Sequence, residues 1–277
     1  MEIIPLLLLV LVCAALVLGY PVALTLAGVS ILFSLLCIPA GIFDPDIFKS
    51  IPLRIFGIMN NVTLLAVPLF IFMGTILEKS GIAGRMLENM ALAFKNFRGG
   101  LSISIIVVGA LLAASTGIVG ATVVTMGLMS LPVLIQQGYK KDFSTGLVAA
   151  TGTLGQIIPP SIALVLLGDV MSNAYQRAQN NMGIFSQKTV TVGDLFIGAI
   201  IPGILICSSY LLYTIYQNSK NVNIQFLPDL VSPPKTEILK TLALPLVLIV
   251  LVLGSIIGGI ATPTEAAAIG AMGAMII

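Results

Sequence analysis

Long apolar segments without any charged residue recur along this chain, and they restrict its fold more than any other feature. A bilayer core is crossed by about 20 helical residues, and lipid tolerates only structures that satisfy their own backbone hydrogen bonds. Only 9% of the residues are charged, whereas a soluble domain carries about 25%. The sequence therefore predicts an all-α polytopic membrane protein.

The composition also excludes several classes of function. The chain has no histidine, so it lacks the commonest general base and metal ligand, and no pair of acids lies in an apolar segment. An intramembrane enzyme is therefore not expected, and a net charge of +2 predicts no nucleic-acid partner. Neither rings of charge nor a filter sequence indicates a pore. Cys13, Cys37 and Cys207 stand isolated in apolar segments, which predicts small hydrophobic side chains rather than disulfides or metal ligands.

Glycine, proline and charged residues divide the apolar sequence into segments. Residues 3–39 are too long for one helix, and Gly19, Tyr20 and Pro21 separate two. The expected order is helices at 3–19 and 20–39, a polar loop at 40–54, a span at 55–78, an amphipathic interfacial helix at 79–98, a hairpin at 101–138, a broken helix at 143–172, a polar stretch at 173–192, spans at 193–216 and 239–258, and a last apolar run from Ala261. Because that run is still apolar at residue 277, we expect a C-terminally truncated piece of a longer protein.

Basic residues favour the cytoplasmic side of a membrane. Segment 79–98 contains four basic residues, and residues 140–141 are both lysine, which predicts that both segments lie inside. Residues 101–138 between them would enter and leave on the same side, as a re-entrant helical hairpin with its tip at 115–122. The same count places the N-terminus outside and residues 217–238 inside.

Two stretches far apart in the chain resemble each other. LLVLVCAALVLGYPVALTLAG near the start and LVLIVLVLGSIIGGIATPTEAAAIG near the end each contain an apolar helix, a glycine-containing turn, a proline and a helix of small residues. The predicted topology runs them in opposite directions, so they are expected to be inverted copies. Inverted repeats with broken helices are typical of ion-coupled secondary transporters. Only the first repeat and the start of the second would be present here.

Two apolar segments are broken near their centres, by STGIVGAT at 115–122 and by TGTLGQIIPPS at 151–161. Glycine permits unusual backbone angles, and proline leaves carbonyl groups of the preceding turn without a partner. Freed carbonyls and hydroxyls are oxygen ligands suited to a cation such as Na⁺, and exposed helix N-termini favour an anion. The breaks therefore predict a site for a coupling cation beside an acidic substrate. The alternative is that they are kinks that only shape packing.

The acids of the apolar segments are assigned other roles. Glu265 in TPTEAAA is expected to cap a helix rather than to bind substrate, because an acid near a helix N-terminus is favourable. The lack of carboxylates and histidines within the spans argues against a proton relay.

At these motifs the chain resembles the large, DctM-like permease subunit of the TRAP (tripartite ATP-independent periplasmic) transporter family. The resemblance is carried by GIMNNVTLLAVPLFIFMG at 57–74, STGIVGATVVTMG at 115–127, GYKKDFSTGLVAATGTLGQIIPPSI at 138–162 and GIATPTEAAAIG at 259–270. It implies a Na⁺-driven, elevator-type secondary transporter of a small organic acid in the bacterial inner membrane, with no cofactor besides the coupling ion. It also implies two partners, a small four-helix membrane subunit and a periplasmic binding protein that delivers the substrate.

The resemblance further implies which residues form the site. The cation-binding positions would be Ser115, Thr116, Gly117, Thr151, Gly152, Thr153 and Pro159. The substrate-binding positions would be Thr122, Gln156, Pro160 and Ser161. The chain departs from the family pattern at Ile118, where a serine is usual, at Thr122, where an aspartate is, and at Gln156, where a proline is. Ligation of a cation by backbone carbonyls tolerates such changes.

Four parts are expected along the chain. They are scaffold helices with the interfacial helix at 1–98, a transport part with the hairpin and broken helix at 99–172, a loop, span and cytoplasmic linker at 173–238, and the start of the second repeat at 239–277. The alternative function is a membrane scaffold or assembly subunit that carries no substrate. The paired polar breaks favour transport, because a scaffold needs no adjacent cation-friendly backbone.

Overall fold

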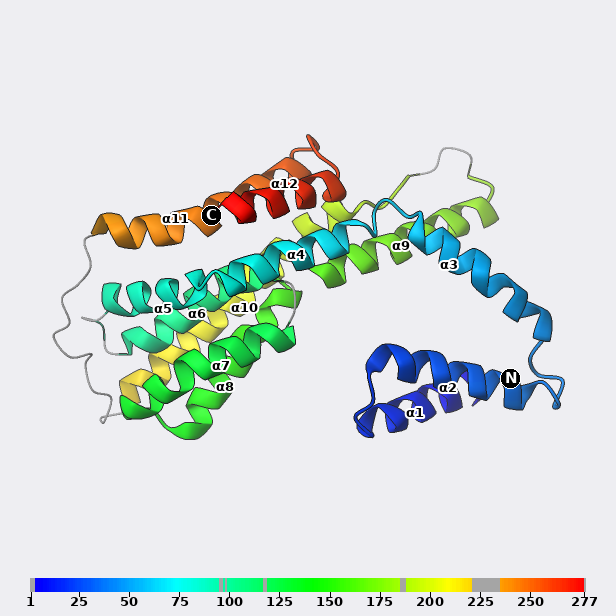
Figure 1. Ribbon diagram of the computed structural model, residues 1–277, viewed down its shortest axis with the longest axis horizontal. Coiled ribbons are helices and arrows are strands. Elements are labelled where there is room, and N and C mark those ends of the chain that lie inside the picture. Colours follow the sequence, from blue (N-terminus) through cyan, green and yellow to red (C-terminus); the bar gives the residue numbers. More distant parts are fainter. Residues whose placement is uncertain are drawn as a thin grey trace. The chain divides into compact units, whose positions relative to one another are not determined.

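The structure is a computed structural model that describes residues 3–94, 97, 99–116, 119–184, 188–220 and 235–276. Every regular element within these residues is helical, as the sequence predicted. The chain divides into two compact units, Met1–Asn61 and Val62–Ile277. Figure 1 labels their helices in chain order.

The first unit is built on two apolar helices joined by a tight turn. Its elements are α1 (Ile3–Val17), α2 (Val22–Cys37), the 3₁₀ helix η1 (Pro45–Ser50) and α3 (Ile51–Met59). Helices α1 and α2 pack against each other, and Gly19 between them has a φ of 81°, which glycine adopts without steric cost. The prediction of a loop throughout 40–54 is wrong, because Pro45 and Pro52 each occupy the first turn of a helix, a position that proline favours.

The second unit packs its helices around the middle of the chain. Its elements are α4 (Ala66–Lys79), α5 (Ile82–Ala93), α6 (Gly100–Thr116), α7 (Val119–Gln136), α8 (Lys141–Thr153), η2 (Leu154–Gln156), α9 (Ile162–Asn181), α10 (Val192–Lys220), α11 (Lys235–Ile257) and α12 (Pro263–Ile276). Helix α6 contacts α4, α5, α7, α8 and α10, and α4 also packs along α12. Fully buried Met73, Ile105 and Ile106 belong to this core. Helices α6, α7 and α8 lie side by side in Figure 1.

Length and composition identify some of these helices as candidate membrane spans. Helix α10 and the Lys240–Ile257 part of α11 are long and apolar enough to cross a bilayer. Helices α4 and α5 pass the same test together, although they are bent by 59° at the break between them. The described residues also include shorter apolar helices, at Ile4–Val17, Val22–Cys37, Gly100–Leu112 and Thr122–Gln136.

The expected span at 55–78 is two helices rather than one. Helix α3 ends at Met59, and α4 begins at Ala66. The side-chain amide of Asn60 donates to the carbonyl of Phe56 at 2.9 Å, which satisfies an end of α3. Pro68 is the third residue of α4, and proline fits the first turn of a helix because the N–H that it lacks would have no intrahelical partner there. These two residues therefore place a break where hydropathy alone shows a continuous segment.

The amphipathic pattern predicted over 79–98 corresponds to α5. Gly81, with a φ of 72°, precedes it and makes the bend after α4. The buried face consists of Ile82, Ala83, Met86, Leu87, Met90 and Ala91. This apolar face packs against α6 and α11 of the same unit. A position of α5 at a membrane surface stays a prediction.

The predicted hairpin at 101–138 is present as the contacting helices α6 and α7. Its re-entrant course through a membrane stays a prediction.

The prediction of a polar, non-helical stretch at 173–192 is wrong in its first half, since α9 continues to Asn181. Its helical part contains Ala174, Gln176, Arg177, Ala178 and Gln179, which are good helix formers. Gln179 then ties the helix end to the chain beyond it, through bonds to both backbone groups of Lys188.

The role predicted for Glu265 is confirmed. Its carboxylate accepts hydrogen bonds from the backbone N–H and the hydroxyl of Thr262, both at 2.8 Å, at the start of α12. This is a capping box with threonine before the helix and glutamate in its first turn.

Helices α11 and α12 pack together and are joined through a glycine of positive φ, Gly259, as α1 and α2 are through Gly19. The two pairs are locally alike, and their relation as inverted copies stays a prediction.

Candidate functional site

The two predicted interruptions lie together in the second unit. The described part of the first is the end of α6, through Thr116, and the start of α7, from Val119; the second separates α8 from α9. The short helix η2 within the second interruption contacts α6, α7, α8 and α9. The polar break at 151–161 therefore packs against the hairpin.

Two glycines permit this close packing. A Cβ atom on Gly109 of α6 would lie 2.0 Å from Cγ2 of Thr151, far closer than atoms can approach. A Cβ atom on Gly152 would lie 2.3 Å from Cγ2 of Val123 on α7, and 3.1 Å from its Cα. The last turn of α8 therefore packs closely against both helices of the hairpin, α6 and α7. A side chain at either glycine would force α8 away from the hairpin.

Three hydroxyl groups along the break donate to nearby carbonyls. Thr151 Oγ1 donates to Leu147 O at 2.6 Å, and Thr153 Oγ1 donates to Ala150 O at 2.7 Å. Ser161 Oγ donates across the break to Gln156 O at 2.8 Å. Each hydroxyl has one proton but two lone pairs, so all three oxygens keep a lone pair with which to coordinate a cation.

The chain leaves the break in an extended conformation and starts a new helix. Pro159 and Pro160 are joined by a cis peptide bond, and Ser161 is extended at φ −113° and ψ 131°. Helix α9 then begins at Ile162, and the first N–H groups of a helix have no intrahelical partner. Gly203 of α10 closes the other side, since a Cβ atom there would lie 3.4 Å from Ile158. The break thus combines ligand oxygens with the positive end of a helix.

The predicted site residues fall into three groups. The buried ones are Thr122, Thr151, Gly152, Pro159, Pro160 and Ser161. Gln156 is half-buried, and Thr153 is exposed. Gly117 and the side chains of Ser115 and Thr116 lie outside the described residues; the backbone of Ser115 and Thr116 ends α6. Thr122 is next in sequence to Val123, and Val123 lies beside Gly152. The start of α7 and the end of α8, which both carry predicted site residues, are therefore close together.

The chemistry available to a cation is that of neutral oxygen. Among the described residues, no group of three acids or cysteines is placed to hold a metal ion. Hydroxyl and carbonyl oxygens are the donor set that the break offers.

The sequence analysis missed an acid close to the hairpin. Thr125 Oγ1 on α7 donates a short hydrogen bond to the carboxylate of Glu78, in the last turn of α4. The signal was present, because Glu78 is the first acid after a long uncharged segment. The bond joins α4 to α7 and helps to fix the second helix of the hairpin.

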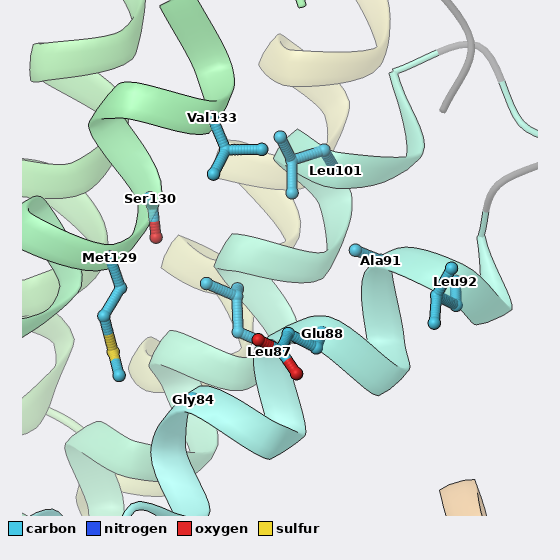
Figure 2. A pocket seen from close by; sticks show the side chains of 9 residues that line it. All are labelled: Gly84, Leu87, Glu88, Ala91, Leu92, Leu101, Met129, Ser130 and Val133. Carbon is cyan, nitrogen blue, oxygen red and sulfur yellow. The ribbon is translucent and has the colours of Figure 1, made fainter. Parts of the chain in front are cut away.

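A cavity of about 470 Å³ lies between α5 and α7, beside the start of α6 (Figure 2). Its walls are mainly apolar, with Leu87, Leu101 and Val133 on three different helices. Ser130 on α7 is fully buried, and its hydroxyl has no hydrogen-bond partner among the described residues. The cavity contains none of the predicted site residues, so it is separate from the break.

Ser130→Ala is expected to raise the free energy of unfolding by about 1 kcal/mol, because it removes a buried polar group without a partner. Thermal or denaturant unfolding in detergent measures the change. The matched control is Ser144→Ala, since Ser144 is equally buried but donates to Lys140 O at 3.0 Å. A loss of stability at Ser130 as large as that at Ser144 would show that the Ser130 hydroxyl is bonded.

Comparison with known proteins connects this arrangement to a family. Residues 9–277 match the family described as "Tripartite ATP-independent periplasmic transporter, DctM component". The C4-dicarboxylate TRAP transporter large permease protein DctM of Vibrio cholerae serotype O1 is 34% identical over 267 residues, which cover 96% of this chain and 54% of the relative. The protein of the same name from Rhodobacter capsulatus is 31% identical, over 95% of this chain and 60% of its own.

Relatives named for another substrate also match. The isethionate TRAP transporter permease protein DctMQ of Oleidesulfovibrio alaskensis is 30% identical over 270 residues, which cover 95% of this chain and 38% of the relative. The chain thus spans 60% or less of the length of these relatives.

Proposed function

The chain belongs to the DctM component family of tripartite ATP-independent periplasmic transporters, and from this premise we propose that it forms part of the large membrane subunit of a cation-coupled importer of small organic acids. The family is one of transport proteins and not of enzymes. The observation that carries the proposal is the packing of the broken α8–α9 segment into the α6–α7 hairpin, with buried hydroxyls at the junction. A scaffold that only held other subunits would gain nothing from polar oxygens at such a junction.

The proposed cation is Na⁺. Thr151 and Thr153, the carbonyls around Gly152 and Pro159, and the hairpin tip at Ser115, Thr116 and Gly117 would supply its oxygen ligands. Support comes from the hydroxyl geometry of α8, where the proton of each threonine already points to a helix carbonyl. A monovalent cation suits a neutral oxygen set better than a divalent ion, which usually requires carboxylates.

The proposed substrate is a small organic acid. The first turn of α9 offers N–H groups and a positive dipole end to a carboxylate, at a place bordered by Pro160 and Ser161. Gln156 at the same break and Thr122 on α7 would provide further polar contacts. The relatives are named for C4-dicarboxylates and isethionate, which are all small anions.

Assembly and movement are proposed from the family. The subunit would lie in the bacterial inner membrane beside a small four-helix subunit and receive substrate from a periplasmic binding protein. Residues 99–172 would move as the transport part of an elevator, against scaffold helices at 1–98. Residues 173–238 would link this part to a second, inverted repeat that starts at 239–277.

Uptake by proteoliposomes tests the proposal. They would contain the full-length subunit with its small subunit, the binding protein, labelled organic acids and an inward Na⁺ gradient. Thr151→Val, which replaces the hydroxyl by a methyl group of similar size, is expected to raise the Na⁺ concentration for half-maximal uptake about tenfold, equivalent to about 1.4 kcal/mol. Thr151→Ser keeps the hydroxyl and is expected to stay near wild type.

The outcomes separate the candidate functions. Equal Na⁺ dependence in Thr151→Val and wild type would remove Thr151 from the cation site. Uptake driven by a pH gradient without Na⁺ would keep the transporter and reject the cation. Absence of uptake of any acid, with folding and subunit assembly intact, would favour the scaffold.

A further inference from the structure

Two adjoining surface hollows on α5 and α11 differ sharply in chemistry. The first, about 490 Å³, is lined by polar and charged residues that include Arg85, Glu88 and Lys240. The second, about 560 Å³, is lined almost wholly by apolar residues of α11 and α12. Lys240 and Leu244 line both, so the polar hollow continues directly into the apolar one.

The geometry points to a binding site for one anionic phospholipid, with its phosphate in the polar hollow and an acyl chain along the apolar one. An anionic phospholipid has a charged headgroup joined to hydrocarbon chains, which matches a polar hollow that continues into an apolar one. Free phosphate has no hydrocarbon part. Basic pockets between membrane helices on the cytoplasmic side are suited to anionic headgroups. The site is separate from the break and does not depend on the function proposed for it.

The polar hollow is positioned by contacts between its two helices. Asn89 Nδ2 of α5 donates to Thr241 Oγ1 of α11 at 3.0 Å, and this bond between two lining residues joins the helices. Arg85 is exposed, and its guanidinium lies 3.5 Å from the carbonyl oxygen of Ser80. With Lys240 and Glu88 the hollow has a net charge of about +1, which matches one phosphodiester group.

The position of Lys240 along α11 fits a headgroup. It begins the stretch Lys240–Ile257, which is long and apolar enough to cross a bilayer, so its ammonium would lie near the membrane surface if this stretch spans the bilayer. The residues that follow along the apolar hollow are exposed, with Leu244 at 50%, Val247 at 53% and Leu251 at 58%. A hydrocarbon chain that covered them would run from the surface toward the membrane centre.

Lipid binding to the purified full-length subunit tests this site. Native mass spectrometry would count bound phosphatidylglycerol, with phosphatidylcholine as the zwitterionic comparison. The double variant Arg85→Gln/Lys240→Gln is expected to weaken phosphatidylglycerol binding by about thirtyfold, the effect of removing two basic side chains at a membrane surface. Glu88→Gln is expected to strengthen it. Glycerophosphoglycerol, which has the headgroup without the tails, is expected not to displace the lipid.

A second basic pair provides the matched control. Lys140→Gln/Lys141→Gln also removes two exposed positive charges, but neither lysine lines either hollow. An equal loss in both pairs would show general electrostatic attraction and overturn the site. Equal binding of the two lipids to the wild type would do the same. Failure of the full-length subunit to retain any lipid on α11 would show that its own chain covers the apolar hollow.

Discussion

Gly109→Ala is expected to lower substrate uptake by about a hundredfold, the cost of a displacement of about 1 Å at a binding site. The added methyl carbon would lie 2.0 Å from Cγ2 of Thr151, and both atoms are on helices whose backbones cannot easily yield. Helix α8 must therefore move away from α6, and the oxygens of the break move with it. Uptake at saturating Na⁺ in proteoliposomes measures the loss.

A second substitution is expected to rescue this variant. Thr151→Ser removes only the colliding methyl group and keeps the hydroxyl, and the next atom that a Gly109 Cβ would meet is Thr151 Cβ at 3.3 Å. The double variant should recover most of the uptake. Gly146→Ala is the control on α8, since nothing lies within 4 Å of a Cβ there. It should leave uptake unchanged, and failure of rescue would mean that Gly109 matters for some other reason.

Gly99→Ala is expected to lower the free energy of unfolding by about 3 kcal/mol, from backbone strain and a lost buried hydrogen bond together. Gly99 has a φ of 82°, and a Cβ atom on it would lie 1.9 Å from Nδ2 of Asn218. That amide is buried and donates to Ser102 Oγ at 2.9 Å. Denaturant unfolding of the purified protein in detergent measures the change.

The Gly99 junction joins three parts of the chain that are distant in sequence. Tyr139 also donates to Ser102, at 3.4 Å, and burial raises the pKa of Tyr139, so its phenol keeps its proton well above neutral pH.

Gly183→Ala is the control for Gly99→Ala, because Gly183 has a φ of 70° but no atom lies within 4 Å of a Cβ there. It isolates the backbone strain, which is about 1–2 kcal/mol. An equal effect of the two substitutions would show that Asn218 moves aside without cost.

The sequence predicted where the chain is broken better than it predicted which parts meet. Glycine, proline and hydroxyl residues act through the backbone next to them, so residue types alone could locate the break at 151–161, where α8 ends at Thr153 and α9 begins at Ile162. Of the break predicted at 115–122, Ser115 and Thr116 belong to α6, and the residues from Val119 onward belong to α7. Pro68 gave a local signal of the same kind for the break before α4, but the hydropathy of 55–78 concealed it. The polar composition of 173–181 likewise concealed a helix, because helix propensity and membrane affinity are different properties.

The contacts within the candidate site could not be predicted in this way. Gly109 and Thr151 are far apart in sequence. The residue types around them do not indicate which glycine of one helix contacts which threonine of another. The bond between Thr125 and Glu78 depends in the same way on the course of the whole second unit. Periodicity identifies the face that a helix buries, but the partner of that face is decided by the packing of all the helices together.

The three hydroxyl bonds along the α8–α9 break imply that the binding of two ligands would be cooperative. Since Thr151, Thr153 and Ser161 donate their protons to carbonyls, their remaining lone pairs attract positive charge and repel a carboxylate. The N–H groups of α9 have the opposite preference. A cation and an anion that occupied the two sides of this interruption would each lower the electrostatic cost of binding the other. By thermodynamic reciprocity, the substrate would then raise the affinity for the ion as much as the ion raises that for the substrate.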